Sequence, residues 1–396
     1  AGQKLWQVLP LNPVAESLSP YTPLSVFAGQ EQLAAELLRC VDWSAEPSEE
    51  YFEFCRNNAD WLDDYALFAA ICEARAGLPW QRWPQAERER EDVPRLMAAY
   101  AEGMENCRRR QYLFRREWHT VKDYANKHGI RIIGDLPIYP AAAGADVWAH
   151  RDLFLLDEAG YPLLSAGVPP DYFAARGQNW GNPLYNWEAM RQDNYRWWRR
   201  RFELALEDFD YLRLDHFRSF AAFYAIPQGE DATQGCWLKG PGHGFFRSIE
   251  RELGRLPLLA EDLGFLDREV YNLLRLAAYP GMAVYQFEPE RIADAAYLSG
   301  RVLYSGTHDN QTLAGWLSAR GGVPAVERER QVINELYQSQ APWVIIPLQD
   351  MFSLGDEARL NVPGQAEGNW RWQADWQQFK LTLAAEYQKM AKSAGR

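Results

Sequence analysis

The chain has 396 residues, enough for a domain with a large buried core, and it carries a net charge of −12 with a pI near 5.2. This acidic balance argues against nucleic acid as a partner, because a polyanion would be repelled. No apolar stretch approaches the length of a membrane span. We therefore expect neither nucleic acid nor a membrane among the partners.

The cysteines and the first residues bear on the compartment. Five cysteines occur without CxxC or Cys/His spacing, and an odd number does not suit a closed set of disulfides. The residues from Ala1 to Trp6 contain no signal-peptide core. We expect free thiols, no metal and a cytoplasmic location.

The first third of the chain predicts two strands followed by helices. Residues 5–11 and 24–27 are candidate strands, apolar and bounded by turn residues. From residue 31 to 118 the pattern becomes helical with charged faces, as in residues 93–124, and predicts a mostly helical insertion. The helical pattern ends at Gly129, a good stop signal, and the strand at 130–138 follows.

After this point apolar runs alternate with helical patterns. The predicted strands are residues 211–217, 256–263, 282–287, 302–309 and 343–348, and the predicted helices are residues 187–206, 245–253, 269–276, 326–337 and 376–390. Eight strands with helical crossovers indicate an α/β protein with a parallel sheet. We predict one (β/α)8 TIM barrel over residues 1–396, with the insertion at 31–118 inside it.

Three predicted strands end in a carboxylate. Asp215, Glu261 and Asp309 occupy these positions, and Asp135 lies on a fourth strand. The carboxyl ends of barrel strands form the active-site rim, and paired carboxylates there are what glycosidic-bond chemistry requires. The pattern predicts a glycoside-cleaving or glycoside-transferring site.

The residues around these acids leave alternatives open. Arg213 shares a strand face with Asp215 and would favour its ionised, nucleophilic form, or the pair could simply brace the barrel. Glu261 follows an apolar run, so burial would raise its pKa and suit a general acid, but Asp262 could be the functional acid instead. His308 could be a structural histidine.

Several motifs together resemble the amylomaltase (disproportionating enzyme) family of 4-α-glucanotransferases, glycoside hydrolase family 77. The motifs are Gly134-Asp-Leu-Pro-Ile-Tyr139, Gly167-Val-Pro-Pro-Asp-Tyr-Phe173, Gly177-Gln-Asn-Trp-Gly-Asn-Pro-Leu-Tyr185, Arg213-Leu-Asp-His-Phe-Arg218, Leu259-Ala-Glu-Asp-Leu-Gly264 and Ser305-Gly-Thr-His-Asp-Asn310. Trp6-Gln-Val-Leu-Pro-Leu11, Ser19-Pro-Tyr21 and Gly355-Asp-Glu-Ala-Arg-Leu-Asn-Val-Pro-Gly364 extend the match towards both ends.

The resemblance implies a role for each matching residue. Asp215 would be the nucleophile, Glu261 the acid/base and Asp309 the transition-state stabiliser. The expected substrate-binding residues are Tyr21, Asp135, Asp171, Phe173, Gln178, Trp180, Arg213, His216, His308 and Asn361. Tyr21 would stack on the sugar. Trp180 could instead be an ordinary core residue.

We therefore predict transfer of α-1,4-glucan segments between maltooligosaccharides or starch- or glycogen-derived chains, with retention and without a cofactor. An α-1,4-glucan hydrolase of the α-amylase clan is the nearer alternative, and an inactive glucan-binding barrel is the other. Family members are usually longer, and this chain looks abbreviated between about residues 29 and 61 and between 289 and 301.

Overall fold

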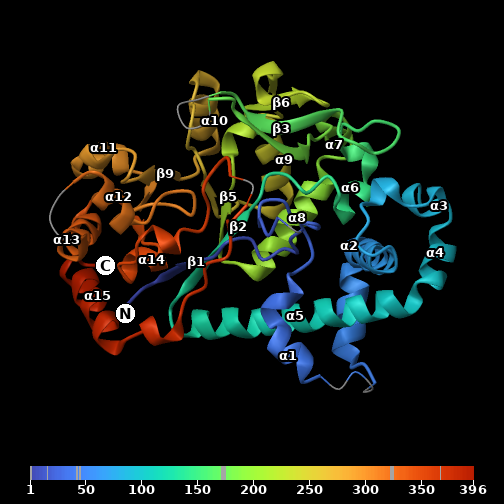
Figure 1. Cartoon of the computed structure of the whole chain (residues 1–396), viewed down its shortest axis with the longest axis horizontal. Coiled ribbons are helices and arrows are strands. Elements are labelled where there is room, and N and C mark those ends of the chain that lie inside the picture. Colours follow the sequence, from blue (N-terminus) through green and yellow to red (C-terminus); the bar gives the residue numbers. More distant parts are fainter. Residues whose placement is uncertain are drawn as a thin grey trace.

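Seven parallel strands form the centre of the molecule (Figure 1). The computed structural model describes residues 2–15, 17–41, 43, 46–170, 175–321, 325–365 and 367–396. The parallel strands are β1 (Leu5–Gln7), β2 (Arg131–Leu136), β5 (Tyr211–Leu214), β8 (Leu258–Ala260), β9 (Gly281–Val284), β10 (Arg301–Tyr304) and β11 (Trp343–Ile345). They pair in the orders β1-β2-β5-β8 and β9-β10-β11. The Ala260 amide donates to the Pro280 carbonyl at 2.8 Å and joins the two sets.

Side chains from all seven strands enclose one apolar interior. Its members are Leu5, Ile133, Tyr211, Leu259, Met282, Val284, Val302, Tyr304, Trp343 and Ile345. The Tyr211 and Trp343 rings, from β5 and β11, meet with centroids 4.7 Å apart. The Tyr304 hydroxyl of β10 donates to the Gln7 side chain of β1 at 2.8 Å. These contacts connect non-neighbouring strands through the interior, as barrel closure requires.

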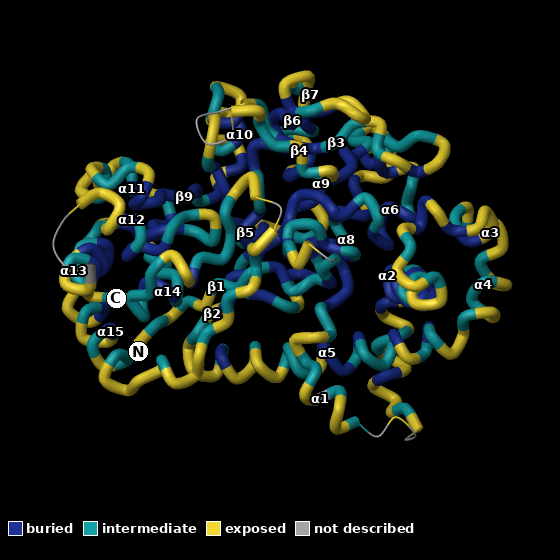
Figure 2. Tube along the Cα trace, in the orientation of Figure 1, coloured by how far each residue is buried: buried dark blue, intermediate teal, exposed yellow. Residues whose placement is uncertain are grey.

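The alternate residues of the same strands face outward against helices, since side chains in a strand alternate between faces. Ile132, Leu212 and Leu258 belong to a large core shared with helical residues such as Trp61 and Phe202. Ala283 and Leu303 belong to a second core with α12 and α13. The strands β2, β5, β8, β9 and β10 are mostly buried, whereas β1 and β11 are not fully covered (Figure 2).

The helices surround these strands. Their bounds are α1 (Ala35–Arg39), α2 (Glu49–Ala74), α3 (Gln85–Arg88), α4 (Val93–Ala99), α5 (Ala101–Lys127), α6 (Ala145–Ala149), α7 (Trp187–Gln192), α8 (Arg196–Asp208), α9 (His243–Leu253), α10 (Arg268–Ala277), α11 (Ala295–Leu298), α12 (Leu313–Ala319), α13 (Ala325–Gln338), α14 (Leu348–Met351) and α15 (Leu381–Ser393). The long α5 runs along one edge of the molecule and leads into β2 (Figure 1).

A separate antiparallel sheet, which the sequence analysis did not predict, forms from connections at the carboxyl end of the barrel. Its order is β4-β3-β6-β7, with β3 (Leu164–Val168) and β4 (Gln178–Pro183) following β2, and β6 (Ala222–Pro227) and β7 (Cys236–Lys239) following β5. The glycine- and proline-containing β3 and β4 have weak strand propensity and depend on distant partners.

The predicted strand at residues 24–27 is wrong. Val26 donates its amide to the Asp146 carboxylate at 2.8 Å, and Phe27 and Ala28 donate theirs to the Ser25 hydroxyl, both at 3.2 Å. Side chains therefore satisfy the backbone groups that a sheet would use, and β1 pairs directly with β2. The apolar run is buried, but as an irregular loop.

Three predicted helices are each interrupted. The pattern at 93–124 is split into α4 and α5 at Tyr100, and the one at 187–206 into α7 and α8, where Asn194 and Tyr195 adopt left-handed backbone angles. The tail at 376–390 begins with a 3-10 turn over Trp376–Gln378, and α15 starts only at Leu381. Periodicity predicted the buried faces but not these local breaks.

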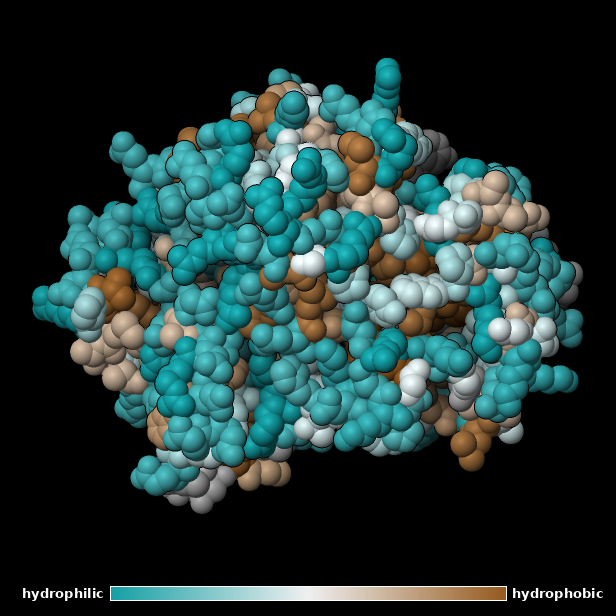
Figure 3. All heavy atoms as spheres, turned by 180° about the vertical axis from the view of Figure 1, so that it is seen from behind, coloured by the Kyte–Doolittle hydropathy of each residue, from teal (hydrophilic) through white to brown (hydrophobic). Residues whose placement is uncertain are grey.

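The outer surface carries mainly hydrophilic residues. Figure 3 shows the face opposite that of Figure 1, on which apolar residues form small separate patches. Within the described ranges, no helix combines the length and the apolar character needed to cross a bilayer.

Packing between β2 and Phe209, which lies between α8 and β5, predicts a stability effect at Gly134. A Cβ added there would lie 2.3 Å from the Phe209 ring. Gly134→Ala should lower the free energy of unfolding by about 1–3 kcal/mol, because the core must shift to admit a methyl group. Urea unfolding would measure this change.

Gly244→Ala is the matched control, because a Cβ at this position in α9 meets no atom within 4 Å. Helix propensity should make that variant as stable as the wild type, or more stable by up to about 1 kcal/mol. Equal stability of the two variants would contradict the tight packing at Gly134.

Candidate active site

An arginine between two aspartates organises the mouth of the barrel. Asp135 of β2 lies opposite Arg213 of β5 in the strand register. One Arg213 nitrogen donates to both Asp135 carboxylate oxygens at 2.8 Å and to Asp215 at 3.3 Å. Because Arg213 and Asp215 are two residues apart, both face the interior, as the sequence predicted.

Glu261 follows β8 beside Asp215. The register pairs Leu214 with Ala260, so the next step along the two strands brings Asp215 and Glu261 together. The backbone amides of His216 and Leu263 donate to the Glu261 carboxylate at 2.7 and 3.0 Å, one to each oxygen. Two fixed donors therefore orient this carboxyl group.

Asp262 points away from Glu261, into the outer packing of the barrel. Its side chain is fully buried and accepts from the Met282 amide at 2.6 Å and from Arg301 at 2.7 Å. These two donors link β8 to β9 and β10, and the strand alternation places Asp262 on the face opposite to Glu261. Of the two adjacent acids, Glu261 is the one in the mouth of the barrel.

Asp309 lies in the loop between β10 and α12. It accepts from the Asn361 side chain at 2.6 Å, and Arg359 donates to its carbonyl at 2.7 Å. The Asn361 amide also donates to the His308 carbonyl at 3.2 Å. The Asp309 side chain is 47% exposed. The loop from residue 359 to 361 thus holds an accessible carboxylate at the rim.

Tyr21 and His308 form an aromatic wall beside Asp135. Their rings stack with centroids 4.8 Å apart, and the Tyr21 hydroxyl donates to Asp135 at 2.7 Å. Burial raises the pKa of Tyr21 well above its usual value, and the Asp135 charge raises it further, so the hydroxyl stays protonated. Burial lowers the pKa of His308, which favours a neutral imidazole.

The antiparallel sheet supplies the opposite side of the site. Gln178 and Trp180 lie two apart on β4, and the Trp180 indole donates to the Gln178 amide oxygen at 3.2 Å. The Trp180 ring meets His216 edge-on, with centroids 4.9 Å apart. Trp180 therefore lies beside the residue that follows Asp215. The predicted residues Asp171 and Phe173 lie outside the described residues.

Trp370 is a site residue that the sequence analysis missed. Its ring lies 5.7 Å from the rings of both Tyr21 and His308. Its backbone is left-handed, with φ of +62°, and its amide donates to the Leu360 carbonyl at 2.7 Å. A bulky residue at positive φ is strained, and such strain gathers at functional sites. The sequence feature that could have identified Trp370 is its position beside Asn369, shortly after the Gly355–Gly364 motif.

Burial raises the pKa of both central acids, Asp215 and Glu261. Burial raises the pKa of Glu261, and the Asp215 charge raises it further, against the opposing effect of Arg213. Burial also raises the pKa of Asp215 by more than Arg213 lowers it. The effect of Arg213 on the Asp215 pKa has the predicted downward direction, but the net shift is upward because burial outweighs Arg213 and the Asp135 charge adds to burial.

This arrangement can carry general acid and nucleophile chemistry. A buried carboxyl that keeps its proton, next to a second carboxylate facing the same opening, is the pairing used on glycosidic bonds. Burial lowers the pKa of the neighbouring His216 to about 3, so this imidazole is neutral at physiological pH. Across the residues placed in the structure, no group of three or more His, Cys, Asp or Glu side chains could hold a metal ion.

Comparison with known proteins decides the family. A family model described as 4-alpha-glucanotransferase, glycoside hydrolase family 77, matches residues 32–378. The chain is 37% identical to the 4-alpha-glucanotransferase of Thermus thermophilus, covering 100% of this chain and 92% of that one. It is 36% identical to that of Synechocystis, with 98% and 90% covered.

The chain belongs to the 4-alpha-glucanotransferase family. This confirms the family and the enzyme class predicted from the motifs, and the prediction of transfer between α-1,4-glucans. The alignment with the Thermus enzyme extends over 461 positions, more than the 396 residues of this chain. The relative therefore has internal segments that are absent here.

Solved structures agree with the fold. The amylomaltase of Streptococcus agalactiae, solved in complex with acarbose, superposes with a TM-score of 0.90 at 29% identity, covering 100% of this chain and 92% of that one. The amylomaltase of Corynebacterium glutamicum has a TM-score of 0.78 at 17% identity, with 99% and 70% covered, and supports the fold alone. The predicted TIM barrel is confirmed.

The first prediction from the site separates the two adjacent acids. Glu261→Gln should lower turnover of maltotriose by roughly 10²–10⁴-fold, the usual contribution of a positioned acid/base, with the melting temperature nearly unchanged. Asp262→Asn should instead lower the melting temperature, since it weakens the pairing with Arg301, while the folded protein keeps most of its activity. The opposite ranking would assign the chemistry to Asp262.

The second prediction concerns Trp370. Trp370→Ala and Trp370→Gly both remove the ring, so both should lower maltotriose turnover. The glycine variant should be more stable than the alanine variant by about 1 kcal/mol, because glycine adopts left-handed backbone angles without strain. Thermal unfolding and product analysis would measure the two effects.

Trp376→Ala is the matched control, because this tryptophan is 83% exposed and lies in the 3-10 turn preceding α15. It should leave turnover unchanged. Wild-type turnover in both Trp370 variants would exclude a role for the ring in the site.

Proposed function

We propose that Asp215, Glu261 and Asp309 carry a retaining double displacement that transfers α-1,4-glucan segments from a donor to an acceptor glucan. The observation that supports this most is the placement of Asp215 and Glu261 at adjacent strand ends, on one face. Neighbouring strands lie about 4.8 Å apart, which suits the carboxyl separation of about 5–5.5 Å used by retaining enzymes.

The first step breaks the donor bond. Glu261 donates its proton to the glycosidic oxygen while Asp215 attacks the anomeric carbon, and the reducing-end fragment leaves. The raised pKa of Glu261 supports its role as the acid. The amides of His216 and Leu263 then stabilise the carboxylate that remains.

The second step reverses the roles. Glu261 takes the proton of the acceptor 4-hydroxyl, whose oxygen attacks the covalent glucosyl–Asp215 intermediate and restores an α-1,4 bond. Asp309 would bind sugar hydroxyls more tightly in the flattened transition state than in the ground state, which lowers the barrier. Its exposure at the rim and its hydrogen bond with Asn361 suit this role.

The remaining side chains would bind the sugars. Tyr21 and His308, backed by Trp370, offer ring faces for the sugar at the cleavage position, and Trp180 with Gln178 offers an aromatic face and an amide next to it. Arg213 and Asp135 would hold Asp215 in place. Asp171 and Phe173 complete the proposed set of subsite residues.

We also propose that the whole chain works as one catalytic barrel. The boundary at residue 118 falls inside α5, a single helix that runs from the 31–118 insertion to β2. Residues of α2, β2 and β5 share one core. These features support an insertion that folds with the barrel.

The cell compartment and partners are part of the same proposal. We propose a cytoplasmic enzyme acting on maltooligosaccharides or starch- or glycogen-derived glucans. Cys40, Cys55, Cys72, Cys107 and Cys236 are all free thiols, which suits a reducing compartment. The net charge of −12 disfavours nucleic acid as a partner.

Incubation with maltotriose alone tests the reaction. The expected products are glucose and longer maltooligosaccharides, with almost no gain in reducing ends, because each transfer breaks and forms one bond. Asp215→Asn serves as the control and should give no products. Rising reducing ends without longer chains would identify a hydrolase, and tight glucan binding without turnover an inactive barrel.

A further inference from the structure

A buried arginine stands behind the proposed nucleophile without a carboxylate in ion-pair contact. Arg201 of α8 is 1% exposed. Among the described residues its guanidinium donates to the carbonyls of Pro137 and Ile138, the latter at 3.2 Å, and forms no ion pair. Its charge lies over the Trp197 and Trp198 rings, 5.7 and 4.7 Å from their centroids. Burying a cation that no carboxylate neutralises costs free energy, so the burial of Arg201 indicates a functional role.

The two carbonyls belong to the segment that joins β2 to the nucleophile. Just before them, the Leu136 carbonyl accepts the Asp215 backbone amide at 3.2 Å. The Ile138 amide lies near enough to the Asp215 carboxyl group to lower its pKa. The Tyr185 hydroxyl adds a second donor to the Ile138 carbonyl, at 2.7 Å. Residues 136–138 are therefore held between Asp215 on one side and Arg201 on the other.

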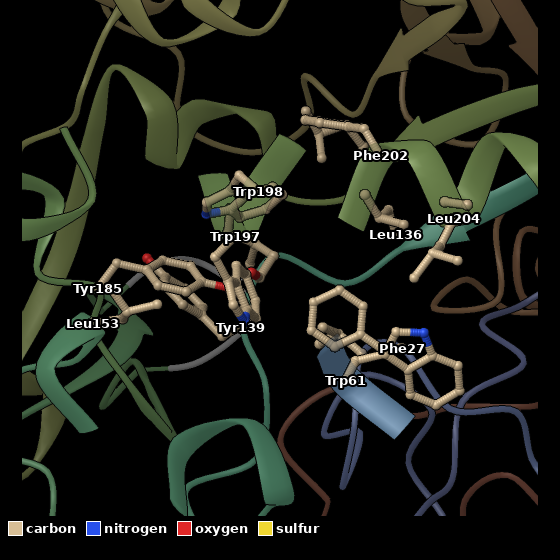
Figure 4. Packing of buried hydrophobic residues seen from close by; sticks show 14 of the residues in the cluster. Phe27, Trp61, Leu136, Tyr139, Leu153, Tyr185, Trp197, Trp198, Phe202 and Leu204 are labelled. Atoms are coloured by element: carbon tan, nitrogen blue, oxygen red, sulfur yellow. The ribbon is translucent and has the colours of Figure 1, made fainter. Parts of the chain in front are cut away.

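Aromatic packing makes this support rigid. Figure 4 shows Trp197, Trp198, Tyr139 and Tyr185 grouped together in the core. The Arg201 guanidinium lies over two of these rings, those of Trp197 and Trp198. Arginine suits the position because its planar fork can bind two carbonyl oxygens at once and does not lose its proton. Lysine offers a compact charge without this geometry.

Around Asp215 the carboxylates outnumber the cations that contact them. Asp135 and Asp215 share Arg213, so two carboxylates face one cation. Glu261, Asp309 and Tyr21 bring no positive charge, and burial keeps His216 and His308 neutral. Arg201, whose guanidinium holds the Pro137 and Ile138 carbonyls behind Asp215, brings a further buried positive charge.

One other acid faces Arg201 and has to be counted. Asp146 of α6 is buried, and its carboxylate accepts the Val26 amide at 2.8 Å. Burial raises the pKa of Asp146 to about 7, although Arg201 lowers it. Below that pH Asp146 carries a proton, and the charge of Arg201 then acts on Asp215. Tyr139 and Tyr185 stay protonated, because burial raises their pKa values.

We propose that Arg201 is a positioning residue of the transfer reaction, which fixes the Pro137–Ile138 backbone against Asp215 and supplies the second buried positive charge that favours the ionised nucleophile. The inference rests on the proposed role of Asp215. It goes beyond that role, because Arg201 lies behind the site and touches no substrate.

The pH dependence of kcat/KM for maltotriose tests the proposal, with thermal unfolding measured alongside. The acid limb reports ionisation of Asp215. Arg201→Met removes the charge and should move this limb to higher pH by about half a unit or more, because an opposite charge nearby lowers a carboxyl pKa. It should also lower kcat/KM at the optimum by about 10-fold or more. An acid limb at the wild-type pH would overturn the electrostatic part of the proposal.

Arg201→Lys keeps the charge and loses the fork, and it covers the case in which the methionine variant does not fold. Its acid limb should stay at the wild-type pH, while kcat falls by about 10-fold because the Ile138 amide is no longer fixed. A wild-type kcat in Arg201→Lys would overturn the positioning part.

Two controls separate this inference from its premises. Arg90 lies 4.5 Å from the centroid of the Trp148 ring and pairs with Asp64, away from the site, so Arg90→Met should lower the melting temperature without moving the limb. Asp215→Asn should be inactive. If Asp215→Asn turns over maltotriose, the proposed nucleophile is wrong. If Asp215→Asn is inactive but the acid limb of Arg201→Met stays at the wild-type pH, only the proposed role of Arg201 is wrong.

Discussion

The site depends on the Arg213 guanidinium, buried between Asp135 and Asp215. Burying three charged groups is unfavourable unless each is paired, and one cation cannot fully satisfy two carboxylates. Its hydrogen bonds go mainly to Asp135, and burial raises the pKa of Asp215 by more than Arg213 lowers it. Because Arg213 neutralises Asp215 only in part, the Asp215 carboxylate would keep the electron density that the proposed attack on carbon requires.

Strand geometry extends this pair into a site. The register of β2, β5 and β8 places Asp135 level with Arg213 and Glu261 level with Asp215, with all four side chains on the same face. Side chains one position away, such as Asp262, turn outward and link the strands instead. The difference between a structural and a chemical carboxylate is therefore set by the alternation of the strand.

Strained loops complete what the strands begin. His216 and Trp370 have left-handed backbones, with φ of +47° and +62°, and both contact other site residues. Each such residue costs on the order of 1–3 kcal/mol, which the two large apolar cores around the barrel offset. Transfer and hydrolysis differ only in whether an acceptor glucan or water reaches the proposed covalent intermediate. Acceptor binding would therefore differ from that of the Thermus enzyme in these loops and where this chain lacks segments of that enzyme.

The sequence by itself determined the seven parallel strands and the positions of their carboxylates, because apolar runs and terminal acids are local patterns. It also carried the motifs that identify the family. It could not show that residues 24–27 form a loop, because the Asp146 and Ser25 side chains, rather than a neighbouring strand, satisfy their backbone groups. Only the tertiary structure turned Glu261 towards the mouth of the barrel and Asp262 outward, brought Trp370 to Tyr21 and placed Arg201 behind Asp215. Each of these depends on which distant groups a side chain meets, and side chains with the same local pattern can meet different partners.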